Sequence, residues 1–142
     1  MRLAANVGCR LHLIEPLGFT LDDAKLRRAG MDYRDRAVVL IHQDLAAWLA
    51  DARPERVFAF SNQGETRYSD VYYEPGDSLL FGPESVGLPD EVMHAPFITA
   101  VVHIPMQPGV RSLNLANAAA IATYEAWRQR AFALTDRLAG DG

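Results

Sequence analysis

Short apolar runs alternate with segments of helical periodicity along the chain. Apolar runs of this length are typical of buried strands. The intervening segments place apolar residues three and four positions apart, as Leu45, Trp48 and Leu49 do, which is typical of one helix face. This alternation predicts an α/β fold with a mostly parallel sheet flanked by helices. Strands are predicted over 11–14, 38–41, 56–60, 78–81 and 101–104, helices over 3–8, 20–29, 45–50, 90–94 and 114–130, and a short strand or extended segment over 69–73.

Residues of the capping type mark the ends of several predicted helices. Gly8 and Gly30 each follow a helical segment, where glycine commonly ends a helix. Thr20 or Asp22, and Asp44 further along, precede helical segments and are of the type that caps an N-terminus. These residues therefore mark predicted helix boundaries.

Two turns rich in glycine and proline follow two of the predicted strands. The first spans 82–89, and the second begins at 105 and continues into a polar cluster over 111–118. Glycine allows a close backbone approach, and proline fixes φ and removes a donor, so such turns hold carbonyls and amides in set directions. Ligands of open α/β sheets bind beyond the carboxyl ends of the strands. The sequence therefore predicts a small-molecule site built largely from backbone groups.

The composition fits a single domain of ordinary size, and the net charge limits the partner classes. The chain has 142 residues and a formal charge of -4, whereas RNA-binding proteins usually carry a basic surface. Basic residues are frequent in the first quarter, and two interpretations remain open for them: a solvated helix face or an RNA-facing patch. They are Arg10, Lys25, Arg27, Arg28, Arg34 and Arg36.

Cysteine and histidine usage favours a reduced, metal-free protein. Cys9 is the single cysteine and carries no nucleophile motif around it, so we expect a packed thiol. The sequence has no signal peptide and no long apolar span, which favours a cytoplasmic protein without membrane contact. The four histidines lack ligand-like spacing, and we expect His103, within an apolar run, to be a satisfied structural residue. They are His12, His42, His94 and His103.

The turn motifs carry a resemblance to a known family. Phe-Gly-Pro-Glu-Ser-Val-Gly-Leu-Pro over 81–89, Ile-Pro-Met over 104–106 and Arg-Ser-Leu-Asn-Leu-Ala-Asn-Ala over 111–118 closely resemble the second and third motifs of the SPOUT (trefoil-knot) RNA 2'-O-ribose methyltransferases. The segments 2–9, 14–19 and 26–33 resemble the minimal branch that methylates the wobble nucleotide of certain leucine tRNAs. The resemblance covers nearly the whole chain.

This resemblance implies a fold, a reaction and partners. The implied fold is a single SPOUT domain over 1–142, with a deep C-terminal trefoil knot formed by the closing helix. The implied activity is methyl transfer from S-adenosylmethionine, leaving S-adenosylhomocysteine, to the wobble cytidine or modified uridine of tRNA, without a metal. In the family the closing helix also lies at a homodimer interface, so a homodimer acting on tRNA is expected.

The family pattern also assigns residues to the site. It places Phe60, Gly82, Glu84, Ile104, Met106, Ser112 and Leu113 around the methyl donor, and Arg2, Ser112 and Asn114 in catalysis. Arginine is a poor base because its pKa is far above neutrality, so Arg2 would stabilise the developing alkoxide or pass the proton to phosphate. Glu84 has an alternative interpretation as a carboxylate that caps a helix.

One departure concerns the N-terminus. Members of the branch carry a further apolar strand and an Asn-x-Gly-Asn loop before the arginine that Arg2 matches, and this sequence begins at Met1. We expect the reading frame to start upstream, because loss of the strand would expose a sheet edge and an apolar helix surface. If the element is lost, the alternative function is a cofactor- or RNA-binding module without turnover. A nucleotide-binding enzyme of another type is disfavoured, because no Gly-x-Gly-x-x-Gly or Walker-type loop follows any predicted strand.

Overall fold

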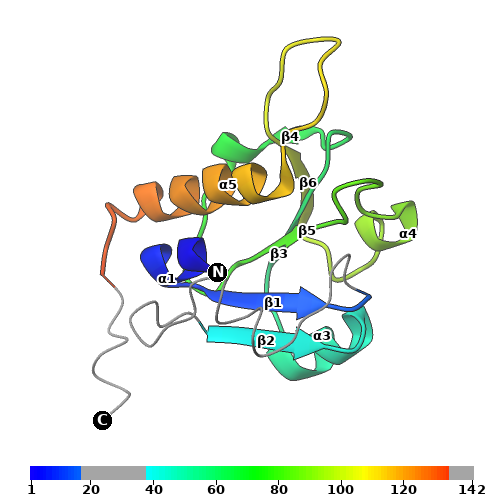
Figure 1. Ribbon diagram of the computed structural model, residues 1–142. Helices are drawn as coiled ribbons and strands as arrows, with labels where there is room; N and C mark the ends of the chain where they lie inside the picture. The colour runs from blue at the N-terminus through cyan, green and yellow to red at the C-terminus, as the bar shows by residue number, and fades with distance from the viewer. Residues whose placement is uncertain (17–37, 135–142) are drawn as a thin grey trace. The chain divides into compact units, whose positions relative to one another are not determined.

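The computed structural model describes residues 1–16 and 38–134 (Figure 1). The chain divides into two compact units. Of the described residues, the first unit holds those up to Arg53 together with 133–134, and the second holds 54–132. The predicted helix over 20–29 and the basic residues from Lys25 to Arg36 lie outside the described residues.

Two parallel strands and two helices form the described part of the first unit. They are α1 (Arg2–Val7), β1 (Arg10–Ile14), β2 (Val38–His42) and α3 (Leu45–Ala52). β1 and β2 pair in parallel from Arg10 with Val38 to Ile14 with His42. Gly8 ends α1 in the left-handed conformation, with φ 76°, and the Asp44 side chain accepts a hydrogen bond from the Ala47 amide at 2.8 Å. Both predicted caps are confirmed.

Four parallel strands form the sheet of the second unit, in the order β4-β6-β3-β5. Their bounds are β3 (Val57–Phe60), β4 (Thr66–Arg67), β5 (Ser78–Phe81) and β6 (Ala100–His103). The unit also contains a 3-10 helix, η1 (Tyr68–Asp70), and the helices α4 (Asp90–Met93) and α5 (Leu115–Gln129). Every residue of the central strand β3 is buried, as expected for a strand with neighbours on both sides. A central cluster of the core consists of Phe58, Phe60, Tyr73, Val102 and Ala122.

The predicted α/β class with a parallel sheet is confirmed, and the differences from prediction are local. Every strand pair among the described residues is parallel. The segment 69–73 is neither a strand nor fully extended, because η1 occupies its first half. The short strand β4 was not predicted, since two residues are too few to show a periodicity. The trefoil knot stays a prediction.

A pair of histidines joins the two strands of the first unit. His12 Nδ1 lies 2.9 Å from His42 Nε2, and His42 Nδ1 lies 3.4 Å from a carboxylate oxygen of Asp51 in α3. Trp48, which is buried, packs edge-on against the His12 ring. Burial lowers the pKa of His12, and the neighbouring His42 and Arg10 lower it further. The structure therefore favours the neutral form of His12.

This pKa shift predicts that the protein loses stability in mild acid. Above the unfolded pKa of about 6.5 both states keep His12 neutral. As the pH falls through that value, the unfolded state takes up the proton first, so the free energy of unfolding decreases. We expect His12→Gln to make the decrease between pH 7.5 and 5 shallower, measured by urea denaturation. An NMR titration giving His12 a pKa at or above 6.5 in the folded protein would contradict the prediction.

Candidate active site

The carboxyl ends of three adjacent strands lie together in the second unit. Phe60, the last residue of β3, is paired with Phe81 at the end of β5 and with Val102 near the end of β6. The same three strands run side by side in Figure 1. The loops that leave them therefore begin at one edge of the sheet, where α/β folds bind ligands. Of the predicted site residues, Phe60, Gly82 and Ile104 lie at or directly after these strand ends.

The loop after β5 closes on its own first residue. A Cβ atom on Gly82 would lie 2.3 Å from both the Gly87 carbonyl carbon and the Leu88 nitrogen, which is far inside van der Waals contact. The Gly87 amide donates to the Pro83 carbonyl at 2.8 Å and closes the turn. Gly82 is therefore required by the path of its own loop, independently of any ligand.

Two hydrogen bonds bring the three strand-end loops together. Asn62, after β3, donates through Nδ2 to the Ser112 hydroxyl at 2.8 Å. Glu84, after β5, accepts a long hydrogen bond of 3.4 Å from the Leu115 amide at the start of α5. Because Ser112 and Leu115 both follow β6, one loop links the other two. This arrangement places Ser112, Glu84 and the first turn of α5 in one region.

The polar cluster before α5 starts the helix. The Asn114 side chain accepts hydrogen bonds from the Ala116 and Asn117 amides, at 2.8 and 3.3 Å, which is the geometry of an N-terminal cap. Asn114 Oδ1 is therefore engaged with the helix, and its Nδ2 group is the part that a ligand could contact. The Glu84 contact with Leu115 favours the capping interpretation of that carboxylate.

Apolar side chains of the three strand ends and of the loop after β6 differ in their exposure. Met106 and Leu113 remain 36% and 38% exposed, whereas Ile104 packs partly against the core. Phe60 is buried and stacks on Phe81, with 4.7 Å between the ring centroids. Exposed apolar walls beside strand-end backbone groups, together with a hydroxyl and a carboxylate, suit a ligand with a planar base and a charged amino-acid end. The residues present therefore fit S-adenosylmethionine.

Arg2 belongs to the first unit. It is the first residue of α1 and is exposed. The remaining predicted site residues all lie in the second unit. The catalytic assignment of Arg2 stays a prediction, as do the individual roles of the other site residues.

Sequence reasoning missed Asn62 and was wrong about His103. Two polar residues that follow a buried strand, Ser61 and Asn62, are the signal that could have found Asn62. His103 ends β6, and its Nδ1 atom is buried with no hydrogen-bond partner among the described residues. The expectation that the His103 side chain is satisfied was therefore wrong. His103 lies one residue before Ile104 of the site.

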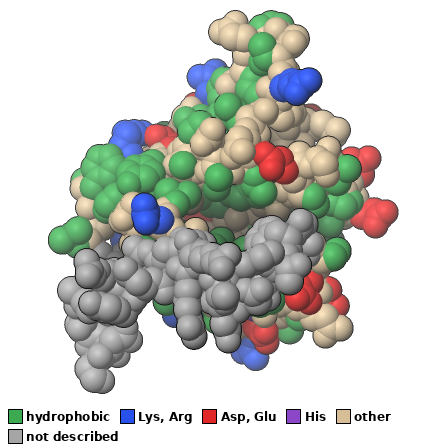
Figure 2. Space-filling model, in the orientation of Figure 1, with side chains coloured by type: hydrophobic (Ala, Val, Ile, Leu, Met, Phe, Trp, Pro, Cys, Tyr) green, Lys and Arg blue, Asp and Glu red, His purple; other side chains and the backbone are tan. Residues whose placement is uncertain are grey.

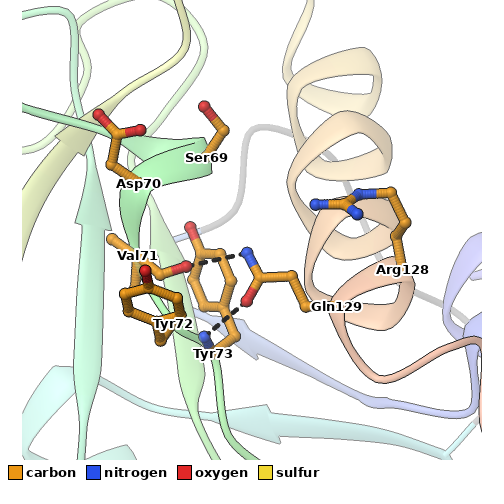
Figure 3. A pocket seen from close by; sticks show the side chains of 7 residues that line it. All are labelled: Ser69, Asp70, Val71, Tyr72, Tyr73, Arg128 and Gln129. Atoms are coloured by element: carbon orange, nitrogen blue, oxygen red, sulfur yellow. Dashed lines mark hydrogen bonds between the residues drawn. The ribbon is translucent and has the colours of Figure 1, made fainter.

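A pocket of about 660 Å³ lies at the opposite end of α5 (Figure 3). The Gln129 side chain lies in the lining of this pocket. Its Oε1 atom accepts a hydrogen bond from the Tyr73 amide at 2.9 Å, and its Nε2 group donates one to the Val71 carbonyl at 2.9 Å. The Tyr73 hydroxyl donates to the Tyr68 carbonyl, and burial raises the pKa of this phenol above its usual value, with a smaller contribution from Glu125. About 21 Å of helix separates this pocket from the start of α5. Its lining is Ser69, Asp70, Val71, Tyr72, Tyr73, Arg128 and Gln129.

The described residues contain neither a metal-ligand cluster nor a membrane-spanning helix. Within 1–16 and 38–134, no group of three or more histidine, cysteine or carboxylate side chains is arranged to hold a metal ion. The helices in those ranges are all too short or too polar to span a bilayer.

Comparisons with known proteins agree with this architecture. The model of the SpoU rRNA Methylase family matches residues 1–124. The chain belongs to this family. The tRNA (cytidine(34)-2'-O)-methyltransferase of Burkholderia ambifaria is 50% identical over 134 residues, which is 93% of this chain and 86% of the relative.

Two solved structures extend the comparison. A structure described as "Structural insights into the 2-OH methylation of C/U34 on tRNA" is 50% identical, with a TM-score of 0.79 over 92% of this chain and 80% of that one. An AdoMet-bound rRNA methyltransferase from Sinorhizobium meliloti is 27% identical, with a TM-score of 0.72 over 94% of this chain and 50% of that one. The SpoU/SPOUT fold predicted from the motifs is therefore confirmed.

The geometry of Gly82 predicts a structural cost for any side chain there. We expect Gly82→Ala to force the 82–88 loop apart and to lower the free energy of unfolding by about 1–3 kcal/mol, the usual range for overpacking. The Gly87 amide should also lose protection from hydrogen exchange. Ser85→Ala, in the exposed part of the same loop, is the matched control and should behave as wild type. A wild-type free energy of unfolding in Gly82→Ala, with wild-type protection of the Gly87 amide from exchange, would show that the loop can accommodate a Cβ atom and would contradict the prediction.

Proposed function

We propose that this chain transfers the methyl group of S-adenosylmethionine to the 2'-hydroxyl of nucleotide 34 in tRNA. The observation that carries the proposal is 50% identity over 93% of the chain to a tRNA (cytidine(34)-2'-O)-methyltransferase. The name of that relative supports cytidine 34 as a target. The solved structure that is 50% identical is described as concerning C/U34, which supports uridine 34 as a target as well. The joined strand-end loops supply a region of suitable chemistry for the methyl donor.

The methyl donor would be held by the loops after β3, β5 and β6. Backbone groups of Phe60, Gly82 and Ile104 would hold its adenosine part, with Met106 and Leu113 as apolar walls. Ser112 and Glu84 would face the polar amino-acid end. When bound, the donor supplies an activated methyl group on a sulfonium, so the chain needs to orient the reactants and help remove one proton.

The target ribose would be activated by the chain's charged and polar side chains. The 2'-oxygen forms a bond to the methyl carbon as the carbon–sulfur bond breaks, giving the 2'-O-methyl ribose and S-adenosylhomocysteine. Arg2 would stabilise the negative charge that develops on the 2'-oxygen as its proton leaves for a phosphate or for water. Ser112 and Asn114 Nδ2 would orient the ribose or the donor.

Further parts of the proposal concern assembly and setting. We assign the chain to one SPOUT domain with a trefoil knot, active on leucine tRNAs in the cytoplasm as a homodimer. Apolar side chains gather toward the C-terminal end of α5 in Figure 2. Exposed apolar residues of α5 include Ile121 and Tyr124, and Phe132, just after the helix, is exposed as well. Small residues over 118–120 would let a second backbone approach closely. This surface supports α5 as the dimer contact.

The function is tested by methyl transfer to defined tRNA. Radiolabelled S-adenosylmethionine is incubated with the protein and leucine tRNA transcripts that carry ribose or 2'-deoxyribose at position 34. We expect label in the first and none in the second. A protein that binds the donor but labels no tRNA would support the alternative of a binding module without turnover.

Arg2→Ala separates catalysis from donor binding in this assay. Because Arg2 would act on the ribose and phosphate, we expect methyl transfer to fall by at least about 100-fold, while the affinity for S-adenosylmethionine by calorimetry stays at the wild-type value. Arg2→Lys should retain part of the rate, since it keeps a positive charge without the planar fork. Full activity in Arg2→Ala would remove this residue from the mechanism.

A charge on the exposed face of α5 tests the homodimer. Tyr124 is 42% exposed and packs edge-on against Trp127, so Tyr124→Glu would bury a carboxylate in the proposed contact. We expect sedimentation at micromolar concentration to change from dimer to monomer, with loss of methyl transfer. Arg130→Glu, at the exposed residue that follows the last residue of the same helix, is the control and should remain dimeric. A wild-type protein that sediments as a monomer would contradict this part of the proposal.

A further inference from the structure

The turn that carries Asn62 is held tightly against β6. The Ser61 amide donates to the Val102 carbonyl at 2.9 Å, and the Gly64 amide donates to the Ser61 carbonyl at 3.0 Å. The Gln63 amide also donates to the Ser61 hydroxyl, at 3.2 Å. A Cβ on Gly64 would lie 2.5 Å from the Val102 carbonyl carbon, so the turn lies directly on the strand backbone. Asn62 therefore projects from a well-anchored segment.

The loop that carries Ser112 has few such anchors. All residues from 105 to 113 are exposed. Within the part of the chain that the structure describes, the bond between Asn62 Nδ2 and Ser112 Oγ is the hydrogen bond that ties this stretch to the rest of its unit. The anchored turn is thus joined to the exposed loop through this hydrogen bond.

The direction of this bond determines what the Ser112 hydroxyl can do. A hydroxyl has one hydrogen to donate and can accept through its lone pairs, whereas the amide nitrogen of asparagine only donates. Because Asn62 Nδ2 donates, Ser112 Oγ accepts, and the hydroxyl hydrogen is directed away from Asn62. Ser112 is thereby prepared to donate to an acceptor oxygen of a ligand.

We infer that Asn62 is a positioning residue, which holds the Ser112 hydroxyl as a hydrogen-bond donor to a carboxylate or ribose oxygen of the bound methyl donor. This inference rests on the proposed function and deepens it. Asn62 itself does not contact the reacting atoms. Its contribution is to fix both the place and the polarity of a side chain on an exposed loop.

A double-mutant cycle on the full chain tests the inference through binding. S-adenosylmethionine and S-adenosylhomocysteine are titrated calorimetrically into wild type, Asn62→Ala, Ser112→Ala and the double variant. We expect Asn62→Ala to raise the dissociation constant about three- to tenfold, the usual effect of one lost hydrogen bond. In the Ser112→Ala background the same change should have no further effect, because both variants remove one interaction. Gln63→Ala, in the same turn, is the matched control and should bind as wild type.

Asn62→Asp separates positioning from simple anchoring. An aspartate can hold the loop by accepting from the Ser112 hydroxyl, but this reverses the bond and uses the hydrogen that the ligand needs. We expect wild-type thermal stability with an affinity at least as weak as that of Asn62→Ala. In steady state, the KM for the methyl donor should rise while the KM for tRNA stays unchanged. Wild-type affinity in Asn62→Asp would show that the bond only holds the loop.

The outcomes distinguish this inference from the proposed function. If wild type methylates tRNA but the effects of Asn62→Ala and Ser112→Ala on donor affinity multiply, the inference is wrong and the function stands. Unchanged donor affinity in Ser112→Ala has the same meaning. If wild type neither binds the donor nor methylates tRNA, the proposed function fails, and the inference fails with it.

Discussion

The parallel pairing of β3 with a strand on each side is the constraint on which the candidate site depends. Phe60 faces Phe81 in one neighbour and Val102 in the other, so three strands end at the same level. Parallel strands cannot be joined by tight hairpins. After each of these strands the chain must therefore leave the edge of the sheet in a loop before it returns to form another strand. The three loops therefore start side by side, and their polar groups are concentrated there by topology.

Close backbone contacts then keep these loops near the sheet. Gly64 lies against the backbone of β6, and Gly82 lies against the far end of its own loop. Because the backbone is closely packed at both glycines, side chains such as Asn62, Ser112 and Glu84 can form hydrogen bonds from one loop to another. A site made in this way depends on backbone path more than on long reactive side chains, which agrees with a reaction whose activated group arrives on the cosubstrate.

Local features of this protein could be predicted from sequence, and long-range pairings could not. The apolar runs gave the strands from β1 to β6 except β4, and Asp44 and Asn114 marked helix starts that the structure shows. The contact of Asn62 with Ser112 joins residues 50 positions apart, so no local pattern contains it. Gly82 could be recognised as part of a turn, but its reason, the return of Gly87 and Leu88, appears only in three dimensions. The family motifs could predict the site loops because they reflect a fold in which residues far apart in the sequence already lie together.

Hydrogen bonds hold helix α5 at both of its ends. Asn114 and Glu84 hold its first turn, and Gln129 fastens its last turn to the backbone at Val71 and Tyr73. A helix that is fixed at both ends resists both sliding along its axis and tilting. An incoming molecule near Ser112 is therefore accommodated more easily by the exposed stretch over 105–113, which has few hydrogen bonds, than by a shift of the helix itself.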